Sequence, residues 1–260
     1  MDEMKLQPVI IVTGASKGLG AAIASVATEY GAKVVLAARS ESELVLRAEE
    51  MQQNGGIVHY VVGDISRYDD CQRIVEETIQ TFGRIDALIN NAGLIEPLAP
   101  ISEADHTEWA YHIVVNLLGP LMMCQLVIPY LRQTKGRVVN ITSHAAEISI
   151  PGASAYSSSK AALNRFSKTL ALEEPEITTL LFIPGETDTP MQTAIREKGK
   201  GKTTDDFYQY FVSLHEQGKL LPPKKPALAA ISLALKAPHE LSGEVLQWDD
   251  ERVQELAKQL

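Results

Sequence analysis

Apolar runs without alternation are the feature that most limits the folds open to this chain. Residues 9–12 read VIIV, residues 34–38 read VVLAA and residues 178–183 read TTLLFI. A strand with one exposed face alternates apolar and polar side chains, whereas a strand covered on both faces does not. Helix-like segments separate these runs, and strands that alternate with helices form right-handed βαβ units. The sequence therefore predicts an α/β fold of three layers, in which helices cover both faces of a doubly wound parallel sheet.

Strand and helix patterns continue along most of the chain. Strands are predicted at residues 9–13, 33–38, 57–62, 85–89, 137–141 and 177–183. Helices are predicted at residues 18–30, 41–53, 69–82, 105–134 and 154–172. A length of 260 residues suits one large α/β unit with a sheet of about seven strands. We therefore expect a single domain over residues 1–260.

One segment, residues 191–226, departs from this pattern. It is rich in lysine, glycine and polar residues, and it carries four aromatic side chains: Phe207, Tyr208, Tyr210 and Phe211. We interpret it as a helical flap over the functional site. The alternative is a surface excursion with no functional role.

A glycine-rich turn lies between the first strand and the first helix. Gly14, Gly18 and Gly20 allow positive φ and a close backbone approach to a pyrophosphate. The helix N-terminus that follows presents free N–H groups and a partial positive charge to an anion. This order of strand, turn and helix predicts a dinucleotide site of the Rossmann type. The alternative is a tight turn without a ligand.

Composition excludes several other classes. The formal net charge of -9 argues against a general nucleic-acid binder. Two cysteines, Cys71 and Cys124, cannot form a disulfide framework, and no histidine spacing indicates a metal site. Residues 1–5 are polar and acidic, unlike a signal peptide, and no stretch approaches the ~20 apolar residues of a membrane span. We expect a cytoplasmic protein that binds neither membrane nor metal.

Tyr156 and Lys160 are four residues apart in a predicted helix, with Ser143 upstream. Residues four apart share a helix face. A free tyrosine has a pKa of about 10, and a nearby ammonium group favours the phenolate and lowers that value. We therefore expect Lys160 to lower the pKa of Tyr156, so that Tyr156 transfers a proton while Ser143 stabilises charge on a carbonyl oxygen.

Taken together, these motifs resemble the short-chain dehydrogenase/reductase family in its single-domain form. The likeness runs from about Val9 to at least Pro190 and includes the spacing G-x-x-x-G-x-G, NNAG at residues 90–93 and Pro184-Gly185. It implies a catalytic tetrad of Ser143, Tyr156, Lys160 and Asn116. In that tetrad Asn116 would hold a water molecule behind the lysine.

The family resemblance also implies the cofactor contacts. The end of the second strand meets the adenosine ribose in this fold, and the sequence there, Ala37-Ala38-Arg39, holds no acidic residue to repel a 2′-phosphate. Arg39 offers a fork of donors, Lys17 a second positive charge and Ser40 a hydroxyl, so we expect NADP(H) rather than NAD(H). Further contacts are expected from the glycine turn, the strand ends and a nicotinamide clamp: Gly14, Ser16, Lys17, Gly18, Leu19, Gly20, Asp64, Ile65, Asn90, Ala92, Gly93, Tyr156, Lys160, Pro184, Gly185, Thr187 and Thr189. Most relatives carry Val or Ile where this chain has Thr187.

The predicted substrate pocket is mostly apolar. The aromatic side chains of the flap are expected to form one wall. The other walls are expected from residues that follow three of the strands: Leu94, Ile95, Glu96, His144, Ala145, Ala146, Glu147 and Glu186. Apolar walls suit a ketone, an aldehyde or a 1,2-diketone as the small-molecule substrate. The stretch at residues 90–101 resembles the sepiapterin-reductase-like and benzil-reductase-like branch, which reduces dicarbonyl compounds with NADPH. Relatives commonly pair across helices, so the resemblance implies a homodimer or a homotetramer.

Three alternatives to a carbonyl reductase stay open. The first is an alcohol or steroid dehydrogenase that uses the same residues in the oxidative direction. The second is a redox sensor that binds NADP(H) without turnover, although such a protein would be expected to lose Tyr156 or Lys160. The third is a sugar-nucleotide epimerase, whose larger C-terminal domain this chain lacks.

Overall fold

The computed structural model describes residues 7–260, so the N-terminal stretch judged unlike a signal peptide lies outside the described residues. Seven strands form one parallel sheet in the order β3-β2-β1-β4-β5-β6-β7. The strands are β1 (Val9–Thr13), β2 (Lys33–Ala38), β3 (Ile57–Val62), β4 (Ala87–Asn90), β5 (Arg137–Ile141), β6 (Thr178–Ile183) and β7 (Val245–Gln247). The predicted α/β fold with about seven strands is confirmed. The strand order reverses between β1 and β4, which is where open parallel sheets bind their ligands.

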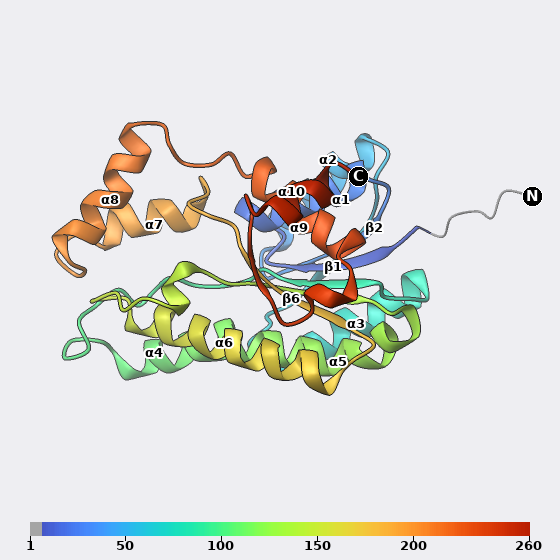
Figure 1. Ribbon diagram of the computed structural model, residues 1–260, viewed down its shortest axis with the longest axis horizontal. Helices are drawn as coiled ribbons and strands as arrows, with labels where there is room; N and C mark the ends of the chain where they lie inside the picture. The colour runs from blue at the N-terminus through green and yellow to red at the C-terminus, as the bar shows by residue number, and fades with distance from the viewer. Residues whose placement is uncertain (1–6) are drawn as a thin grey trace, which may run out of the picture.

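Helices cover both faces of the sheet, as Figure 1 shows. The helices are α1 (Gly18–Glu29), α2 (Glu41–Gln53), α3 (Tyr68–Phe82), α4 (His106–Ile113), α5 (Gly119–Thr134), α6 (Ser154–Glu173), α7 (Pro190–Lys198), α8 (Asp205–Glu216), α9 (Lys224–Lys236) and α10 (Glu251–Ala257). α1, α2, α9 and α10 lie on one side, and α3, α5 and α6 lie on the other. α7 and α8 extend beyond one end of the sheet.

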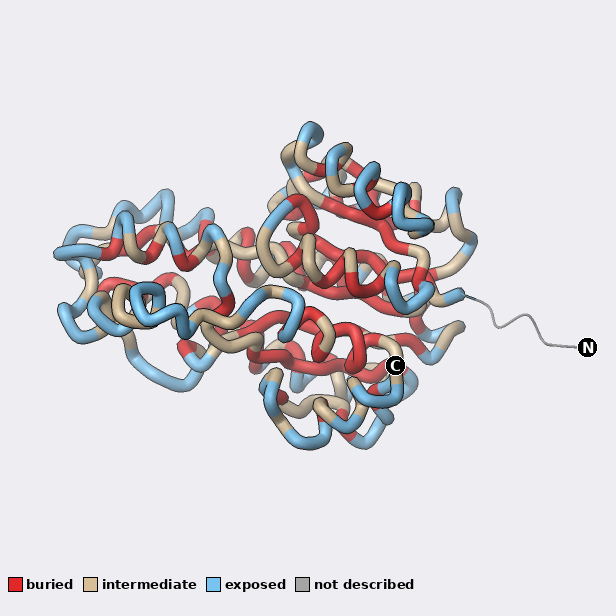
Figure 2. The backbone as a smooth tube through the Cα atoms, turned by 90° about the horizontal axis from the view of Figure 1, so that it is seen from above, coloured by how far each residue is buried: buried red, intermediate tan, exposed pale blue. Residues whose placement is uncertain are grey.

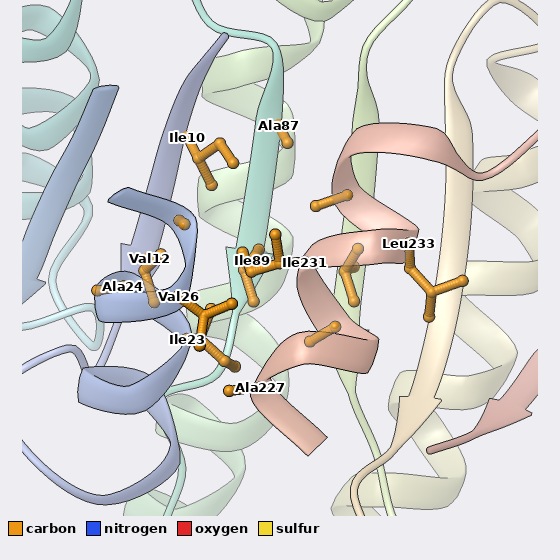
Figure 3. Packing of buried hydrophobic residues seen from close by; sticks show 14 of the residues in the cluster. Ile10, Val12, Ile23, Ala24, Val26, Ala87, Ile89, Ala227, Ile231 and Leu233 are labelled. Atoms are coloured by element: carbon orange, nitrogen blue, oxygen red, sulfur yellow. The ribbon is translucent and has the colours of Figure 1, made fainter. Parts of the chain in front are cut away.

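Successive side chains of the central strands are buried on opposite faces. Ile10 and Val12 belong to the core beneath α1 and α9, whereas Ile11 lies in the core beneath α3 and α5. In Figure 3, side chains of α1 and α9 converge over β1 and β4, with Ile23 and Ile231 among them. Two buried faces explain why these strands carry apolar runs without alternation.

The long helix predicted at residues 105–134 is continuous but not uniform. A π-helical segment, Val114–Leu118, joins α4 to α5 and contains Asn116. Contrary to the sequence expectation, the helix His106–Thr134 contains an 18-residue stretch with a mean hydropathy of 1.7 and is, by length and composition, long and apolar enough to cross a membrane. Its C-terminal half packs against α3 and buries Met123 and Leu131. We therefore interpret its apolar character as that of a core helix.

The flap, predicted at about residues 191–226, contains α7 and α8. Residues 224–226 begin α9, where Pro226 is buried. The excursion is closed at its base by two backbone hydrogen bonds, from Asp188 N to Leu221 O at 2.9 Å and from Leu221 N to Glu186 O at 2.8 Å. Figure 2 shows more exposed residues in this part of the chain than in the sheet region. The flap is therefore anchored at β6 and extends outward from it.

Candidate active site

A cavity of about 860 Å³ lies at the carboxyl ends of the strands. That volume is in the range of ligand pockets, about 300–1,000 Å³. Its walls come from the glycine turn, from the segments after β2 to β6, and from the flap helices α7 and α8. Residues predicted from four separate motifs therefore line one continuous space.

The glycine turn is shaped for close approach of a ligand. Gly14 has φ of 67°, in the region that favours glycine. Lys17 precedes α1 and provides no side-chain cap for the first N–H groups of the helix, and Lys17, Gly18 and Leu19 all line the cavity. This bare, uncapped turn fits the pyrophosphate of a dinucleotide.

Two predicted contacts lie outside this cavity. A side chain on Gly20 would collide with the carbonyl oxygen of Gly14, so Gly20 allows helix and turn to pack rather than contacting a ligand. The amide of Asn90 points into the core and donates to Asn140 Oδ1 at 2.8 Å. Asn91, which the sequence analysis missed, lines the cavity and donates to Thr13 O at 2.9 Å. The NNAG sequence contains two adjacent asparagines, and the motif alone does not say which of them faces a ligand. The path of the backbone after β4 directs the Asn90 side chain to the core and places Asn91 at the cavity.

The end of β2 carries a small charged cluster. Arg39 Nη1 donates to the Tyr111 hydroxyl at 3.1 Å and lies 3.8 Å from Asp64 Oδ2. Tyr111 comes from α4, so a residue 72 positions away holds the guanidinium. Arg39, Asp64 and Glu43 all line the cavity. The sequence analysis missed both Tyr111 and Glu43.

The other expected residues of the nucleotide end also line the cavity. They are Ser16, Lys17, Ser40, Ile65, Ala92, Gly93, Pro184, Gly185, Thr187 and Thr189. Thr187 is 4% exposed and donates to the carbonyl oxygen of Pro184 at 3.1 Å. Thr187 therefore satisfies its hydroxyl within its own turn, which explains how a polar residue occupies this position.

Tyr156, Lys160 and Ser143 meet at one point of the cavity wall. Lys160 is 5% exposed and donates from Nζ to the carbonyl oxygen of Ile141, the last residue of β5, at 2.7 Å. Its Nζ lies 5.7 Å from the centroid of the Tyr156 ring. Ser143 caps the short 3₁₀ turn after β5, where its hydroxyl accepts from Ala145 N at 3.2 Å, and it lines the cavity beside Tyr156.

The pKa values differ from the sequence expectation. Burial raises the pKa of Tyr156, and the hydrogen bond from Ser143 lowers it, whereas we expected Lys160 to lower it. Burial lowers the pKa of Lys160 to about 8. Tyr156 is therefore a protonated phenol at neutral pH, which is the form that a proton donor needs.

Asn116 lies behind this group, in the π-helical segment. Its side chain is buried, with Oδ1 accepting from Leu94 N at 2.8 Å and Nδ2 donating to Leu94 O at 2.9 Å. A π-helical turn breaks the regular backbone pairing and often marks a functional site. The structure thus brings all four residues of the expected tetrad into one region, with Asn116 tied to the wall of the cavity.

The far end of the cavity is mostly apolar. Of the predicted walls, Leu94, Ile95, His144, Ala145 and Glu186 line it. Glu96, Ala146 and Glu147 do not line it, and the sequence analysis missed several further lining residues: Ile148, Ile150, Ala153, Met191, Gln192 and Ile195.

Glu96 turns outward to form an ion pair with Lys198 on α7 at 2.5 Å. The pair therefore ties the flap to the segment after β4. Among residues 7–260, no group of three or more His, Cys, Asp or Glu side chains is placed to hold a metal ion.

The flap contributes aromatic rings to this end. Phe207 and Phe211 pack edge to face, with centroids 4.9 Å apart and planes at 67°. Tyr210 packs on Phe211 with ring centroids 5.1 Å apart, and burial together with the nearby charge of Glu186 raises the pKa of Tyr210. Phe207, Tyr210 and Phe211 all line the cavity and add to its apolar surface.

Comparison with known proteins places the chain among oxidoreductases. The short chain dehydrogenase family matches residues 8–200. A benzil reductase ((S)-benzoin forming) of Saccharomyces cerevisiae is 32% identical over 255 residues, which are 94% of this chain and 97% of that protein. The crystal structure of the KRED1-Pglu enzyme is 40% identical, with a TM-score of 0.88 over 92% of this chain and 100% of that chain.

A more distant solved structure carries a nucleotide. The alcohol dehydrogenase of the archaeon Thermococcus sibiricus, complexed with 5-hydroxy-NADP, is 28% identical, with a TM-score of 0.78 over 93% of this chain and 95% of that chain. Together these matches confirm the family resemblance and the likeness to benzil reductases.

Proposed function

The chain belongs to the short-chain dehydrogenase/reductase family, whose members act on CH–OH and C=O groups, and we propose that it reduces 1,2-diketones of the benzil type with NADPH. The observation that carries this proposal is the convergence of Tyr156, Lys160 and Ser143 on an apolar, aromatic end of the cavity. The similarity to a benzil reductase over most of both chains supports the same substrate class.

In this proposal Tyr156 is the general acid. Its burial keeps the phenol protonated, so it gives H⁺ to the carbonyl oxygen as negative charge develops there. Ser143 hydrogen-bonds to the same oxygen and stabilises that charge. Lys160 lines the same wall, and its ammonium group would donate to the ribose of the cofactor and so orient the nicotinamide beside Tyr156.

A nicotinamide cofactor supplies the hydride for the carbonyl carbon when it is bound. The bare glycine turn and the uncapped N-terminus of α1 would hold its pyrophosphate. Pro184, Thr187 and Thr189 line the neighbouring wall and would hold the nicotinamide end. The residues of the chain bind and orient the cofactor and the substrate, and Tyr156 delivers the proton.

The preference for NADPH rests on Arg39 and Lys17. Both side chains line the cavity at the end of β2 and beside the glycine turn. Arg39 is held by Tyr111 and Asp64, so its fork of donors is oriented before a phosphate binds. The alcohol dehydrogenase of Thermococcus sibiricus, which was solved with 5-hydroxy-NADP, supports a phosphorylated cofactor.

The test is a cofactor and substrate comparison. Purified protein is mixed with NADPH or NADH and with benzil, and loss of the reduced nicotinamide is followed by absorbance. We expect turnover with benzil that is faster with NADPH than with NADH. Equal rates with the two cofactors would contradict the phosphate assignment. Turnover of an alcohol with NADP⁺ but not of benzil with NADPH would favour the oxidative alternative.

Assembly and location are further proposals. We propose a homodimer, because Tyr111 and Leu118 are exposed on the helix His106–Thr134, and Leu172 is exposed on α6. Light scattering coupled to size exclusion tests the mass. A cytoplasmic location stays a prediction, which fractionation of the source cells would test.

A further inference from the structure

A buried histidine lies directly behind the proposed catalytic residues. His112, on α4, has no exposed surface, and both of its ring nitrogens have partners. Nδ1 lies 2.5 Å from the carbonyl oxygen of Glu96, and Nε2 lies 2.8 Å from Nδ2 of Asn116. A carbonyl oxygen only accepts and an amide nitrogen only donates. The two contacts are therefore satisfied together only when Nδ1 carries the hydrogen and Nε2 is bare.

The charge of His112 agrees with this assignment. Burial lowers its pKa to about 4, the Glu96 carbonyl raises it, and the charge of Lys160 lowers it. If both ring nitrogens carried a hydrogen, the N–H group at Nε2 would face the amide N–H group of Asn116, and two donors would oppose each other. His112 is therefore a neutral imidazole at neutral pH, with one fixed tautomer.

The imidazole completes a closed network around Asn116. That amide has two hydrogens, of which one goes to Leu94 O at 2.9 Å and the other to His112 Nε2 at 2.8 Å. Ser159 Oγ accepts from Asn116 Nδ2 at 3.3 Å and donates to the Tyr156 carbonyl oxygen at 2.8 Å. Its single hydrogen is thereby used, so Ser159 contacts Nε2 at 3.0 Å without a hydrogen bond to it. One histidine thus contacts the element that carries Asn116, the wall segment at residues 94–96 and the helical turn that carries Tyr156.

We propose that His112 is a positioning residue for carbonyl reduction. By accepting from Asn116 and donating to Glu96, it fixes the wall segment at residues 94–96 relative to Tyr156. Buried polar groups that are fully satisfied hold a single arrangement, whereas a broken network leaves several. A misplacement of about 1 Å at a reacting group can lower a rate about 100-fold. This inference rests on the proposed function, in which Tyr156 is the acid.

Three variants separate the two hydrogen bonds of His112. His112→Gln can place an amide oxygen near the position of Nε2 and keep the bond from Asn116. His112→Asn can place an amide nitrogen near the position of Nδ1 and keep the bond to Glu96. His112→Phe keeps a ring and removes both bonds. Each is assayed for kcat and KM with benzil, for NADPH affinity by fluorescence and for Tm.

We expect kcat to fall by roughly tenfold or more in the Asn and Phe variants and by less in the Gln variant. The affinity for NADPH should stay near that of the parent in all three, because His112 is not part of the cavity wall. The Gln and Asn variants each lose one hydrogen bond of similar strength and should have similar Tm values. Equal kcat in the Gln and Asn variants, or a kcat order that follows Tm, would overturn the proposal.

A readout without turnover tests the same network. A long-range ¹H–¹⁵N correlation spectrum of the parent protein reports which nitrogen of His112 carries hydrogen, with His112→Phe identifying the signal. We expect a neutral ring protonated on Nδ1 at neutral pH, whereas an imidazolium or the opposite tautomer would overturn the proposal. If the parent reduces no carbonyl compound, the proposed function fails while this spectrum still tests the network.

Discussion

The Nζ atom of Lys160 lies 5.7 Å from the centroid of the Tyr156 ring, one helical turn away on α6. Burial lowers the pKa of Lys160 to about 8. The ammonium form is therefore present below that pH and is lost as the pH rises through it, whereas burial keeps Tyr156 protonated. We expect kcat for reduction to be level in neutral solution and to fall above a pH of about 8. Steady-state rates at saturating NADPH and benzil across this range measure the profile.

The variant Lys160→Arg tests the assignment of that pKa. A guanidinium stays charged at every pH of the experiment. In the variant, any kcat that remains should therefore no longer decrease above the pKa of Lys160. Lys168→Arg is the matched control, because Lys168 is exposed on the same helix. If kcat of the Lys160→Arg variant still decreases in the same pH range, the group that titrates is not Lys160. A level parent profile up to the pKa of a free lysine, about 10.4, would also contradict the prediction.

Tyr156→Phe should remove the proton donor and little else. We expect kcat to fall by about 100-fold or more, since general acid catalysis contributes about 10² to 10⁴. Affinity for NADPH should change little, because Lys160 keeps its hydrogen bond to Ile141. Tyr68→Phe is the control, since Tyr68 is 49% exposed on α3. Retained turnover in Tyr156→Phe would show that another group delivers the proton.

Sequence patterns predicted the parts of the fold that have a strong periodic signal. β1, β2 and β3 begin and end where the apolar runs do. β4 begins two residues later than predicted, because the Asp86 carboxylate accepts from Val9 N and from Arg84. β7 has only three residues, which is too short for a period to be seen.

The sequence predicted those parts of the site that lie within recognisable motifs. Tyr156 and Lys160 share a helix face, and the glycine turn follows its strand as expected. The contacts of Arg39 with Tyr111 and of Glu96 with Lys198 join distant segments, so no local pattern contains them. His112 lies four residues before Asn116 on one helix, a spacing that brings side chains together and that could have pointed to the pair.

Arg39→Asp should change the cofactor preference. The substitution removes the fork of donors and adds an acidic group that can accept from a ribose hydroxyl and repels a 2′-phosphate. We expect the ratio of kcat/KM for NADPH over NADH to fall by roughly tenfold or more, in line with the strength of a charged hydrogen bond. An unchanged ratio would mean that Arg39 does not meet the phosphate.

The control for this change is Arg47→Asp. Arg47 lies on α2 and pairs with Glu50, and it is not part of the cavity wall. It alters the net charge of the protein by the same amount as Arg39→Asp. A similar loss of NADPH preference in both variants would assign the effect to overall charge instead of to a contact.

Phe207→Ala tests the aromatic end of the cavity. Phe207 lines the cavity and packs edge to face on Phe211, so its loss removes apolar surface from the substrate end. Burial of such a side chain contributes about 1.5–3 kcal/mol, which corresponds to a rise in KM for benzil of roughly tenfold or more. Butanedione is a diketone without aryl rings, and its KM should change much less. Leu46→Ala, at a position 49% exposed on α2 and outside the cavity wall, should leave both KM values unchanged. A parallel rise for benzil and butanedione in Phe207→Ala would mean that the flap shapes the site without contacting the aryl groups.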